Sequence, residues 1–149
     1  MEEDEPGAGP ALAPRLLVAF GTNRDRFQKS ADVAEFYGVA PVVAQSGNSK
    51  TVYVRYRCPK FGPQTFHENA GCALKQEPWA KCYYDQQKAR NKGKHHQACR
   101  ALAYKLVRIY FACWKQHKTY EPNRYLMALE KHASPLHRTL KNLTATHCE

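Results

Sequence analysis

Residues 95–117 read His95-His-Gln-Ala-Cys-Arg-Ala-Leu-Ala-Tyr-Lys-Leu-Val-Arg-Ile-Tyr-Phe-Ala-Cys-Trp-Lys-Gln-His117 and form the best helical pattern in the chain. The apolar side chains recur at intervals of three or four residues, at Ala98, Leu102, Leu106, Ile109 and Cys113. Such spacing places them on one face of an α-helix. The remaining faces carry cations and no acidic residue: Arg100, Lys105, Arg108 and Lys115. The stretch therefore predicts a long basic helix whose apolar face packs against other helices.

Further helices are expected on both sides of this stretch, and they make the fold class mainly α. Patterns of apolar residues and helix starts predict helices over Gln64–Lys75, from Pro78 onward and over Pro122–His132. Asn91-Lys-Gly93-Lys separates the second of these from the long helix. Residues 121–149 are expected to form a short helix and a frayed tail. The expected architecture is a small β-hairpin followed by a bundle of about four helices.

The first part of the chain has two sections. Residues 1–5 are an acidic start, and residues 6–37 are a lead-in whose Gly7-Ala-Gly9 turn runs into an apolar helix that Gly21 ends. A glycine turn before a helix leaves backbone N–H groups free to bind phosphate. An ordinary helix start explains the same residues equally well, so both interpretations stay open.

Residues 38–60 combine a small hydroxyl side chain with many cations. The alternation in Thr51–Tyr56 predicts a strand, with residues 39–44 as its hairpin partner and Ser46-Gly47-Asn-Ser49 as the turn. Four cations follow Ser46 without an intervening acidic residue: Lys50, Arg55, Arg57 and Lys60. A serine needs a base, nearby cations or both to attack phosphorus. Ser46 is therefore the candidate nucleophile and Ser49 a weaker one, while a simple turn residue is the alternative.

The composition favours a polyanionic partner. The 149 residues carry a net charge of +10, and their mean hydropathy is −0.69. The first five residues hold four of the thirteen acidic side chains, so the remainder has 23 basic against nine acidic ones. Nucleic acid is the first expected partner and an anionic membrane surface the second. No stretch is apolar enough to span a membrane and the start is not a signal peptide, so a cytoplasmic protein is expected.

The basic residues are densest between Lys75 and Lys118. This segment contains eleven basic residues and only two acidic ones, Glu77 and Asp85. A solvated helix surface normally mixes the two signs, so this surface is expected to face phosphates. The interleaved tyrosines could stack on bases, but a place in the core or at its rim is the favoured interpretation for most of them: Tyr83, Tyr84, Tyr104 and Tyr110.

Metal sites are not expected in the chain. The six cysteines lie far apart and are expected to be reduced and buried. The only close cluster of metal-ligating residue types, His95-His96-x-x-Cys99, is short of the four ligands of a structural zinc site. The acidic residues show no paired-carboxylate pattern that would hold magnesium. His67-Glu68 could transfer protons, but an ordinary pair of helix residues is the favoured interpretation.

Short motifs occur in order along roughly residues 6–120. They are Pro-Gly-Ala-Gly-Pro-Ala-Leu-Ala at 6–13, Phe-Tyr-Gly-Val-Ala-Pro at 36–41, Gln-Ser-Gly at 45–47, Cys-Pro-Lys-Phe at 58–61, Gln-Thr-Phe-His-Glu at 64–68, Tyr83-Tyr84, Lys92-Gly-Lys-His-His96 and Arg100-Ala-Leu-Ala-Tyr-Lys-Leu-Val-Arg-Ile. Together they resemble the C-terminal half of an insertion-sequence-110 family transposase, a group also named for insertion sequences 116 and 902. Their order and spacing carry the resemblance, because no single motif is decisive.

The resemblance implies a recombinase that moves a mobile DNA element. Members of the family join an N-terminal RuvC-like domain with Asp-Glu-Asp-Asp metal ligands to a C-terminal domain whose serine attacks the DNA backbone. They use an element-encoded guide RNA to choose DNA. Ser46 takes the place of that serine, and residues 38–120 correspond to its domain. The Gly7-Ala-Gly9-Pro10 turn resembles the second half of a helix-hairpin-helix, which binds the DNA backbone without sequence preference.

Two departures from the family pattern affect what is expected. The N-terminal metal domain is absent, so the chain resembles a truncated copy, is not expected to act alone, and has no magnesium of its own. Gly62-Pro63 replaces the usual Leu-Arg, which loses a cation and is expected to weaken a helix start.

The expected partners are therefore DNA, with a guide RNA and a second copy of the chain as further candidates, and no membrane. The residues expected to contact nucleic acid are two glycines and nine cations: Gly7, Gly9, Lys50, Arg55, Arg57, Lys60, Lys92, Lys94, Arg100, Lys105 and Arg108. The alternative is a stand-alone helical nucleic-acid-binding module without catalysis, in which Ser46 is only a turn residue.

Overall fold

The computed structural model describes residues 6–146, so the acidic start at 1–5 lies outside the described residues. The elements follow in the order α1 (Leu12–Phe20), α2 (Ser30–Phe36), β1 (Val42–Ser46), β2 (Ser49–Tyr53), α3 (Phe61–Gln76), α4 (Pro78–Arg90), α5 (His95–Gln116), α6 (Pro122–Lys131) and α7 (Pro135–Thr146). The predicted fold class, mainly α with one small β-hairpin, is confirmed. Among the described residues, none of the helices is long and apolar enough to cross a membrane.

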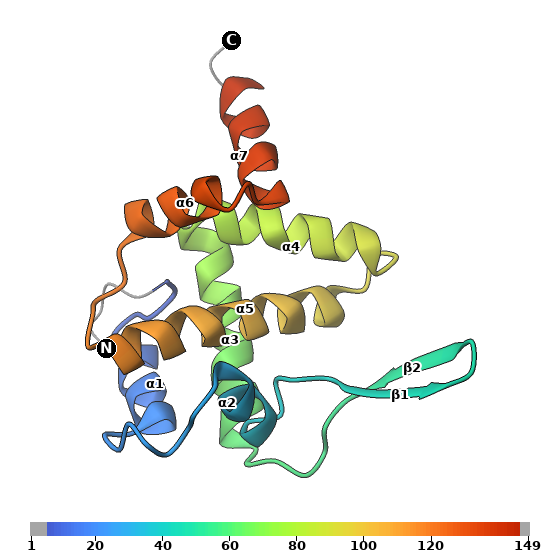
Figure 1. Ribbon diagram of the computed structural model, residues 1–149, viewed down its shortest axis with the longest axis vertical. Coiled ribbons are helices and arrows are strands. Elements are labelled where there is room, and N and C mark those ends of the chain that lie inside the picture. The colour runs from blue at the N-terminus through green and yellow to red at the C-terminus, as the bar shows by residue number, and fades with distance from the viewer. Residues whose placement is uncertain (1–5, 147–149) are drawn as a thin grey trace.

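The long helix α5 is the centre of the helical body (Figure 1). It packs against α2, α3 and α4. The predicted break at 91–94 separates α4 from α5, and the two helices run antiparallel. Of the predicted apolar stripe, Ala98, Leu102 and Leu106 are buried, whereas Ile109 and Cys113 are only partly buried. Because α5 has three neighbours, residues outside the stripe are buried as well: Cys99, Ala103, Val107, Tyr110 and Trp114.

Aromatic side chains join the lead-in to this body. Phe20, at the end of α1, packs against Phe66 of α3 and Trp114 of α5, with ring centroids 6.3 Å and 5.7 Å away. Trp114 Nε1 donates a hydrogen bond to the carbonyl of Gly21, 2.7 Å away. Gly21 has a φ of 70°, which confirms the predicted end of this helix. The lead-in and the later helices therefore share one hydrophobic core.

A polar contact buried in that core ties three distant segments together. Asn69 of α3 donates from Nδ2 to the carbonyl of Pro6, at 3.0 Å. The Tyr110 hydroxyl of α5 lies 2.5 Å from the same carbonyl and 2.7 Å from Asn69 Oδ1, so both oxygens are placed to accept its proton. All three residues are buried. The contact fixes the start of the lead-in against the crossing of α3 and α5.

The start of α3 tolerates the two residues that were expected to weaken it. Pro63 lies in the first turn of the helix, where its missing N–H would have had no helical partner. Gly62 is required by its neighbour, because a Cβ atom added there would lie 2.2 Å from Cδ1 of Tyr37. The helix α3 begins before both residues, at Phe61, three residues earlier than the predicted start at Gln64.

Two further predictions need correction. The expected frayed tail after residue 134 contains α7, which packs on α4 and α6 and buries Leu136. The hairpin forms, but its strands are shifted toward the turn relative to the predicted 39–44 and 51–56. Val42 pairs with Tyr53 and Ser46 with Ser49, so only Gly47 and Asn48 remain in the turn. Gly47 has a φ of 54°, as two-residue hairpin turns require.

Candidate nucleic-acid interface

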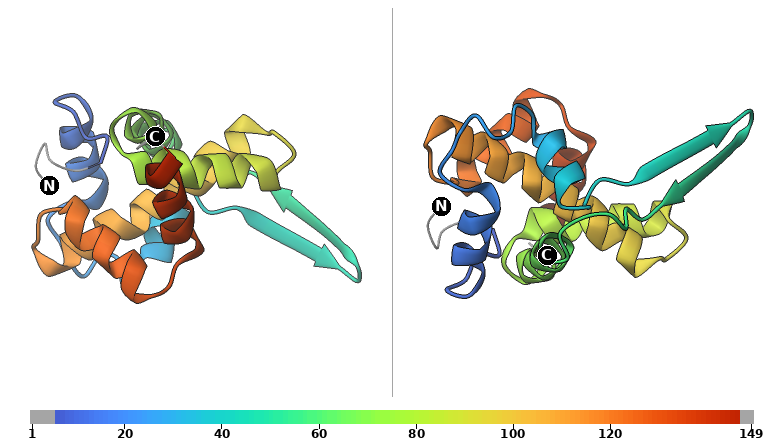
Figure 2. Two further views of the ribbon diagram at one scale, coloured as in Figure 1. Left: turned by 90° about the horizontal axis from the view of Figure 1, so that it is seen from above. Right: turned by 90° about the horizontal axis from the view of Figure 1, so that it is seen from below.

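The hairpin that carries Ser46 projects away from the helices in every view (Figures 1 and 2). All five residues of β1 are exposed, and apolar side chains of β2 such as Val52 and Tyr53 are about half exposed as well. Ser46 is the last residue of β1 and directly precedes the turn. The serine thus lies at the exposed tip of an arm, at the position where the sequence predicts a turn.

The hydroxyl of Ser46 has no catalytic partner in this conformation. Within the part of the chain that the structure describes, no basic or acidic side chain is hydrogen-bonded to it. Ser49 is its cross-strand neighbour. Ser46 is therefore accessible to a large substrate.

The cations that follow Ser46 come from different parts of the chain: Lys50 belongs to β2, and Arg55, Arg57 and Lys60 follow the end of that strand. The Arg55 side chain turns back to the helical body, where Nη2 lies 3.9 Å from Glu35 Oε2. Its Nε atom is buried without a hydrogen-bond partner. Arg57 and Lys60 are exposed between the hairpin and α3. The sequence shows no acidic residue among these cations, but the fold brings Glu35 to one of them from α2.

Lys92 and Lys94 lie in the turn between α4 and α5 and are exposed. This turn and the hairpin project from the same side of the helical body in Figure 1 and in both panels of Figure 2. Lys92 has a left-handed φ of 52°, and Gly93 next to it has a φ of 80°. Two exposed lysines therefore lie in a turn on the side of the body from which the hairpin projects.

Arg100, Lys105 and Arg108 lie farther along α5. At 1.5 Å per residue, Arg108 is about 21 Å from Lys94 along the helix axis. Burial, and next the nearby Arg108, lowers the pKa of Lys105, whose ammonium lies 4.7 Å from the Tyr83 ring centroid. Lys105 and Arg108 line a pocket of about 660 Å³ between α5 and α6. Lys105 and Arg108 thus lie in a different region from Lys92 and Lys94.

The interleaved tyrosines belong to the core or its rim. Tyr110 is fully buried, and Tyr83, Tyr84 and Tyr104 are partly buried against the core. This confirms the favoured interpretation and leaves these rings little surface on which a base could stack.

The two glycines of the lead-in turn differ in their surroundings. The N–H of Gly7 donates to Gln76 Oε1 at 2.9 Å, and a Cβ atom on Gly7 would lie 2.7 Å from Asn69 O and Ala73 N of α3. Gly7 is buried, so its N–H does not point outward as the phosphate-cradle interpretation expects. Gly9 is half-buried, and its carbonyl accepts the first hydrogen bonds of α1.

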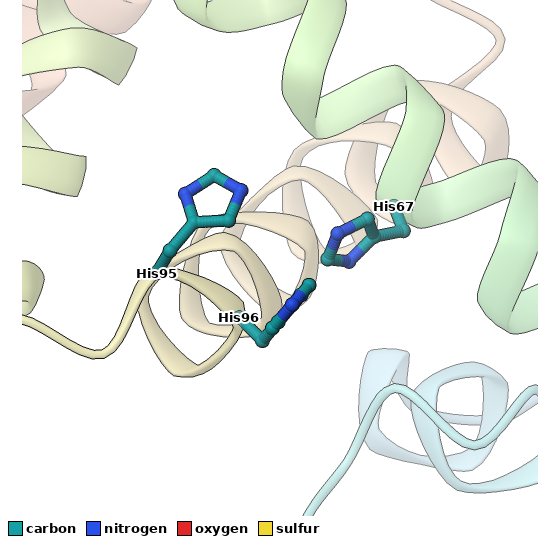
Figure 3. Close-up of side chains that lie close together, drawn as sticks. All are labelled: His67, His95 and His96. Carbon is teal, nitrogen blue, oxygen red and sulfur yellow. The ribbon is translucent and has the colours of Figure 1, made fainter.

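A cluster of histidines forms where α3 passes the start of α5 (Figure 3). One ring nitrogen from each of His67, His95 and His96 lies within 4.8 Å of the others. Burial first, and then the neighbouring His96 and His95, lower the pKa of His67. Glu68 points elsewhere and accepts hydrogen bonds from Arg15 and Gln64, which supports reading His67-Glu68 as ordinary helix residues.

The sequence places His95 and His96 together but gives no local indication of His67 as their neighbour. Only the crossing of α3 and α5 brings the third ring, from 28 residues earlier than His95, to the same place. The cysteines give no comparable group: within the described residues Cys58, Cys72, Cys82, Cys99 and Cys113 are all free thiols.

The class of protein follows from comparison with known families. A family model described as "Transposase IS116/IS110/IS902 family" matches residues 3–85, which is more than half of the chain. The chain belongs to this transposase family. The resemblance that the sequence motifs suggest is thereby confirmed.

Two curated relatives agree with the family. The chain is 31% identical over 120 residues to the insertion element IS110 uncharacterized 43.6 kDa protein of Streptomyces coelicolor, a match that covers 78% of this chain and 28% of the relative. It is 28% identical over 118 residues to the insertion element IS900 uncharacterized 42 kDa protein of Mycobacterium paratuberculosis, covering 78% and 29%. The chain thus spans less than a third of the length of these relatives.

Proposed function

We propose that this chain is a DNA-contacting C-terminal segment of an insertion-sequence transposase in which Ser46 attacks the DNA backbone. The observation that carries the proposal is the position of Ser46 at the exposed tip of a projecting hairpin, within the residues that match the transposase family. A phosphodiester in duplex DNA is reached more readily by a projecting arm than by a side chain in the helical body.

The chemistry is a transesterification at phosphorus. The Ser46 oxygen forms a bond to phosphorus, and the bond between phosphorus and one deoxyribose oxygen breaks. The hydroxyl proton leaves with a base and the departing oxygen takes up a proton, so the number of phosphodiester bonds is conserved. Cations near the phosphate stabilise the charge that develops on its oxygens. Arg57 and Lys60 are exposed beyond the base of the hairpin, several strand residues away from the tip, so they suit neighbouring phosphates of the same DNA rather than the one that Ser46 attacks.

The residues of this chain do not fit the magnesium site that the family implies. The one group of three His, Cys, Asp or Glu residues close enough to share an ion in the described part consists of histidines alone, whereas magnesium prefers carboxylate and water oxygens. We therefore expect the metal-dependent part of the reaction to require a separate domain.

The exposed basic projections support DNA binding that depends on charge. Lys92 and Lys94 lie on the same side of the helical body as the hairpin, and counterion release makes such contacts sensitive to salt. We expect the affinity for a short DNA duplex to fall several-fold between 50 mM and 200 mM salt. An affinity that does not change over this range would contradict the electrostatic part of the proposal.

Trapping of a covalent protein–DNA adduct tests the serine. The full chain is incubated with nicked DNA substrates, alone and with the N-terminal portion of a family relative supplied in trans, and adducts are detected on denaturing gels. We expect no adduct with the chain alone. With the relative's portion present, we expect an adduct that Ser46→Ala abolishes and Ser49→Ala retains.

The two serine variants also separate catalysis from binding. Both residues are exposed strand ends of one hairpin, so neither substitution should alter folding or DNA affinity. An adduct that persists in Ser46→Ala would refute the nucleophile. If no adduct forms while DNA binding is intact, the alternative holds: a helical nucleic-acid-binding module in which Ser46 is only a residue next to a turn. A guide RNA and a second copy of the chain are further proposed partners. The same binding assays carried out with RNA would test the first, and the mass of the complex would test the second.

A further inference from the structure

The histidine cluster brings three imidazoles from two helices to one place outside the hairpin. His67 is half-buried on α3, and His95 and His96 are the first two residues of α5 (Figure 3). The ring centroids of His67 and His96 are 5.9 Å apart, and those of His95 and His96 are 5.3 Å apart. No catalytic or nucleic-acid-binding role proposed above uses these side chains.

The backbone around the cluster is held firmly. His67 lies between the buried residues Phe66 and Asn69, and Asn69 contacts Tyr110 of α5. The start of α5 is packed through Ala98 and Cys99, which are also buried. The distance between the two helices is therefore set by the core, and only the imidazole side chains need to move to accept a ligand.

The spacing of the ring nitrogens suits one small ion. A tetrahedral zinc site with bonds of about 2.0 Å separates its nitrogen ligands by about 3.3 Å. The nitrogens of the cluster lie within 4.8 Å of one another, so closing the site requires shifts of roughly 1.5 Å. Rotation of the exposed rings of His95 and His96 can supply such shifts without moving the helices.

A neighbouring tyrosine orients one of the rings. His95 Nδ1 lies 2.7 Å from the Tyr84 hydroxyl of α4. With Nε2 on a metal, Nδ1–H donates to this oxygen, which is the outer-shell contact that ligating histidines usually make. The Cys99 sulfur lies 3.5 Å from His95 Nε2, but it is not one of the three ligand atoms that lie within 4.8 Å of one another.

We propose that His67, His95 and His96 bind a single Zn²⁺-class ion that links α3 to the start of α5. Imidazole nitrogen favours zinc and the neighbouring transition metals, and the absence of a carboxylate from the group disfavours magnesium and calcium. Three protein ligands leave a fourth position for water. Arg100 lies on the same helix as His95 and His96 and adds a positive charge, which opposes the binding of a cation.

A metal titration of the untagged full chain tests the site. Chelator-treated protein is titrated with Co²⁺ and followed by visible absorption, and Zn²⁺ affinity is measured by competition with a chromophoric chelator. We expect saturation at one ion per chain and a raised thermal midpoint in the presence of Zn²⁺. Excess Mg²⁺ should not displace the ion.

Single substitutions assign the ligands. Each of the substitutions His67→Gln, His95→Gln and His96→Gln should weaken Zn²⁺ binding at least tenfold. The matched control His132→Gln changes an exposed histidine at the end of α6 and should leave binding unchanged, as should Cys99→Ala. Because His96 is exposed, His96→Gln keeps the test valid even if His67→Gln perturbs folding.

Several results would overturn the proposal. The proposal fails if the wild-type chain shows no saturable binding, or if the His96→Gln chain binds Zn²⁺ with full affinity. A His132→Gln chain whose Zn²⁺ affinity falls as far as that of the ligand variants would also overturn it. Displacement of Co²⁺ by Mg²⁺ would contradict a nitrogen site. Loss of binding in Cys99→Ala, with the circular dichroism unchanged, would contradict the set of three histidines.

Discussion

Removing one hydroxyl from the core should weaken the attachment of the lead-in to the helical body. In Tyr110→Phe the ring that packs in the core is kept, so no cavity forms, but the buried oxygens of Pro6 and Asn69 lose the donor they share. Pro6 O keeps its hydrogen bond from Asn69 Nδ2 at 3.0 Å. Asn69 Oδ1 is therefore the acceptor whose hydrogen bonding the substitution weakens most.

The expected loss of stability in Tyr110→Phe follows from the hydrogen-bond donors that remain for these two oxygens. One buried acceptor left without its donor costs about 1–3 kcal/mol in the free energy of unfolding. For a chain of this length each kcal/mol corresponds to roughly 2–4 °C in the thermal midpoint. Urea unfolding should show a lower midpoint with an unchanged slope, since the surface exposed on unfolding is the same.

Two comparisons make this prediction specific. Tyr56→Phe removes the same atom from a side chain that is 89% exposed, and it should change the stability by less than about 0.5 kcal/mol. In a double-mutant cycle, Tyr110→Phe and Asn69→Ala should couple by about 0.5 kcal/mol or more because their side chains touch. Equal midpoints for Tyr110→Phe and the wild-type chain would refute the reasoning.

Two glycine substitutions test close approaches, each with a matched control and each measured by urea unfolding. Gly7→Ala combines a φ of 77° with a Cβ atom 2.7 Å from the backbone of α3, so it should cost at least about 2 kcal/mol. Gly9→Ala meets nothing within 4 Å and should be neutral to about 0.5 kcal/mol; equal losses would show that the packing of Gly7 is not what matters. Gly62→Ala places a Cβ atom 2.2 Å from the Tyr37 ring and should cost about 1–3 kcal/mol. Gly71→Ala enters open space within the same helix and should stabilise by about 0.5–1 kcal/mol, so a Gly62→Ala chain that gains as much would contradict the contact.

The parts of the fold that were predicted well are those with a periodic local pattern. The apolar spacing along residues 95–117 gives α5 to within one residue, and Pro78 gives the start of α4. The helix α7 was missed although Leu136 and Leu140 are four residues apart after Pro135. That signal is short, and what stabilises α7 is packing on α4, which the local sequence does not show.

The strand boundaries and the sites were harder to predict. An exposed two-stranded hairpin buries neither face, so the alternation around Val52 and Val54 does not fix its register. The burial of Gly7 depends on Asn69 and Ala73, more than sixty residues away, and the place of His67 in the cluster depends on a helix crossing. Ser46 could be placed near a turn because turn composition is local.

The hairpin adds nothing to the core, so the stability of the molecule and the presentation of Ser46 depend on different residues. In a sheet of two strands both strands are edges, and each keeps a row of backbone N–H and C=O groups without a sheet partner. Such a ribbon is only marginally ordered by itself. The conformation of the hairpin when it binds a partner is therefore set by that partner. Its residues can be substituted with little effect on the folding of the helices that carry it.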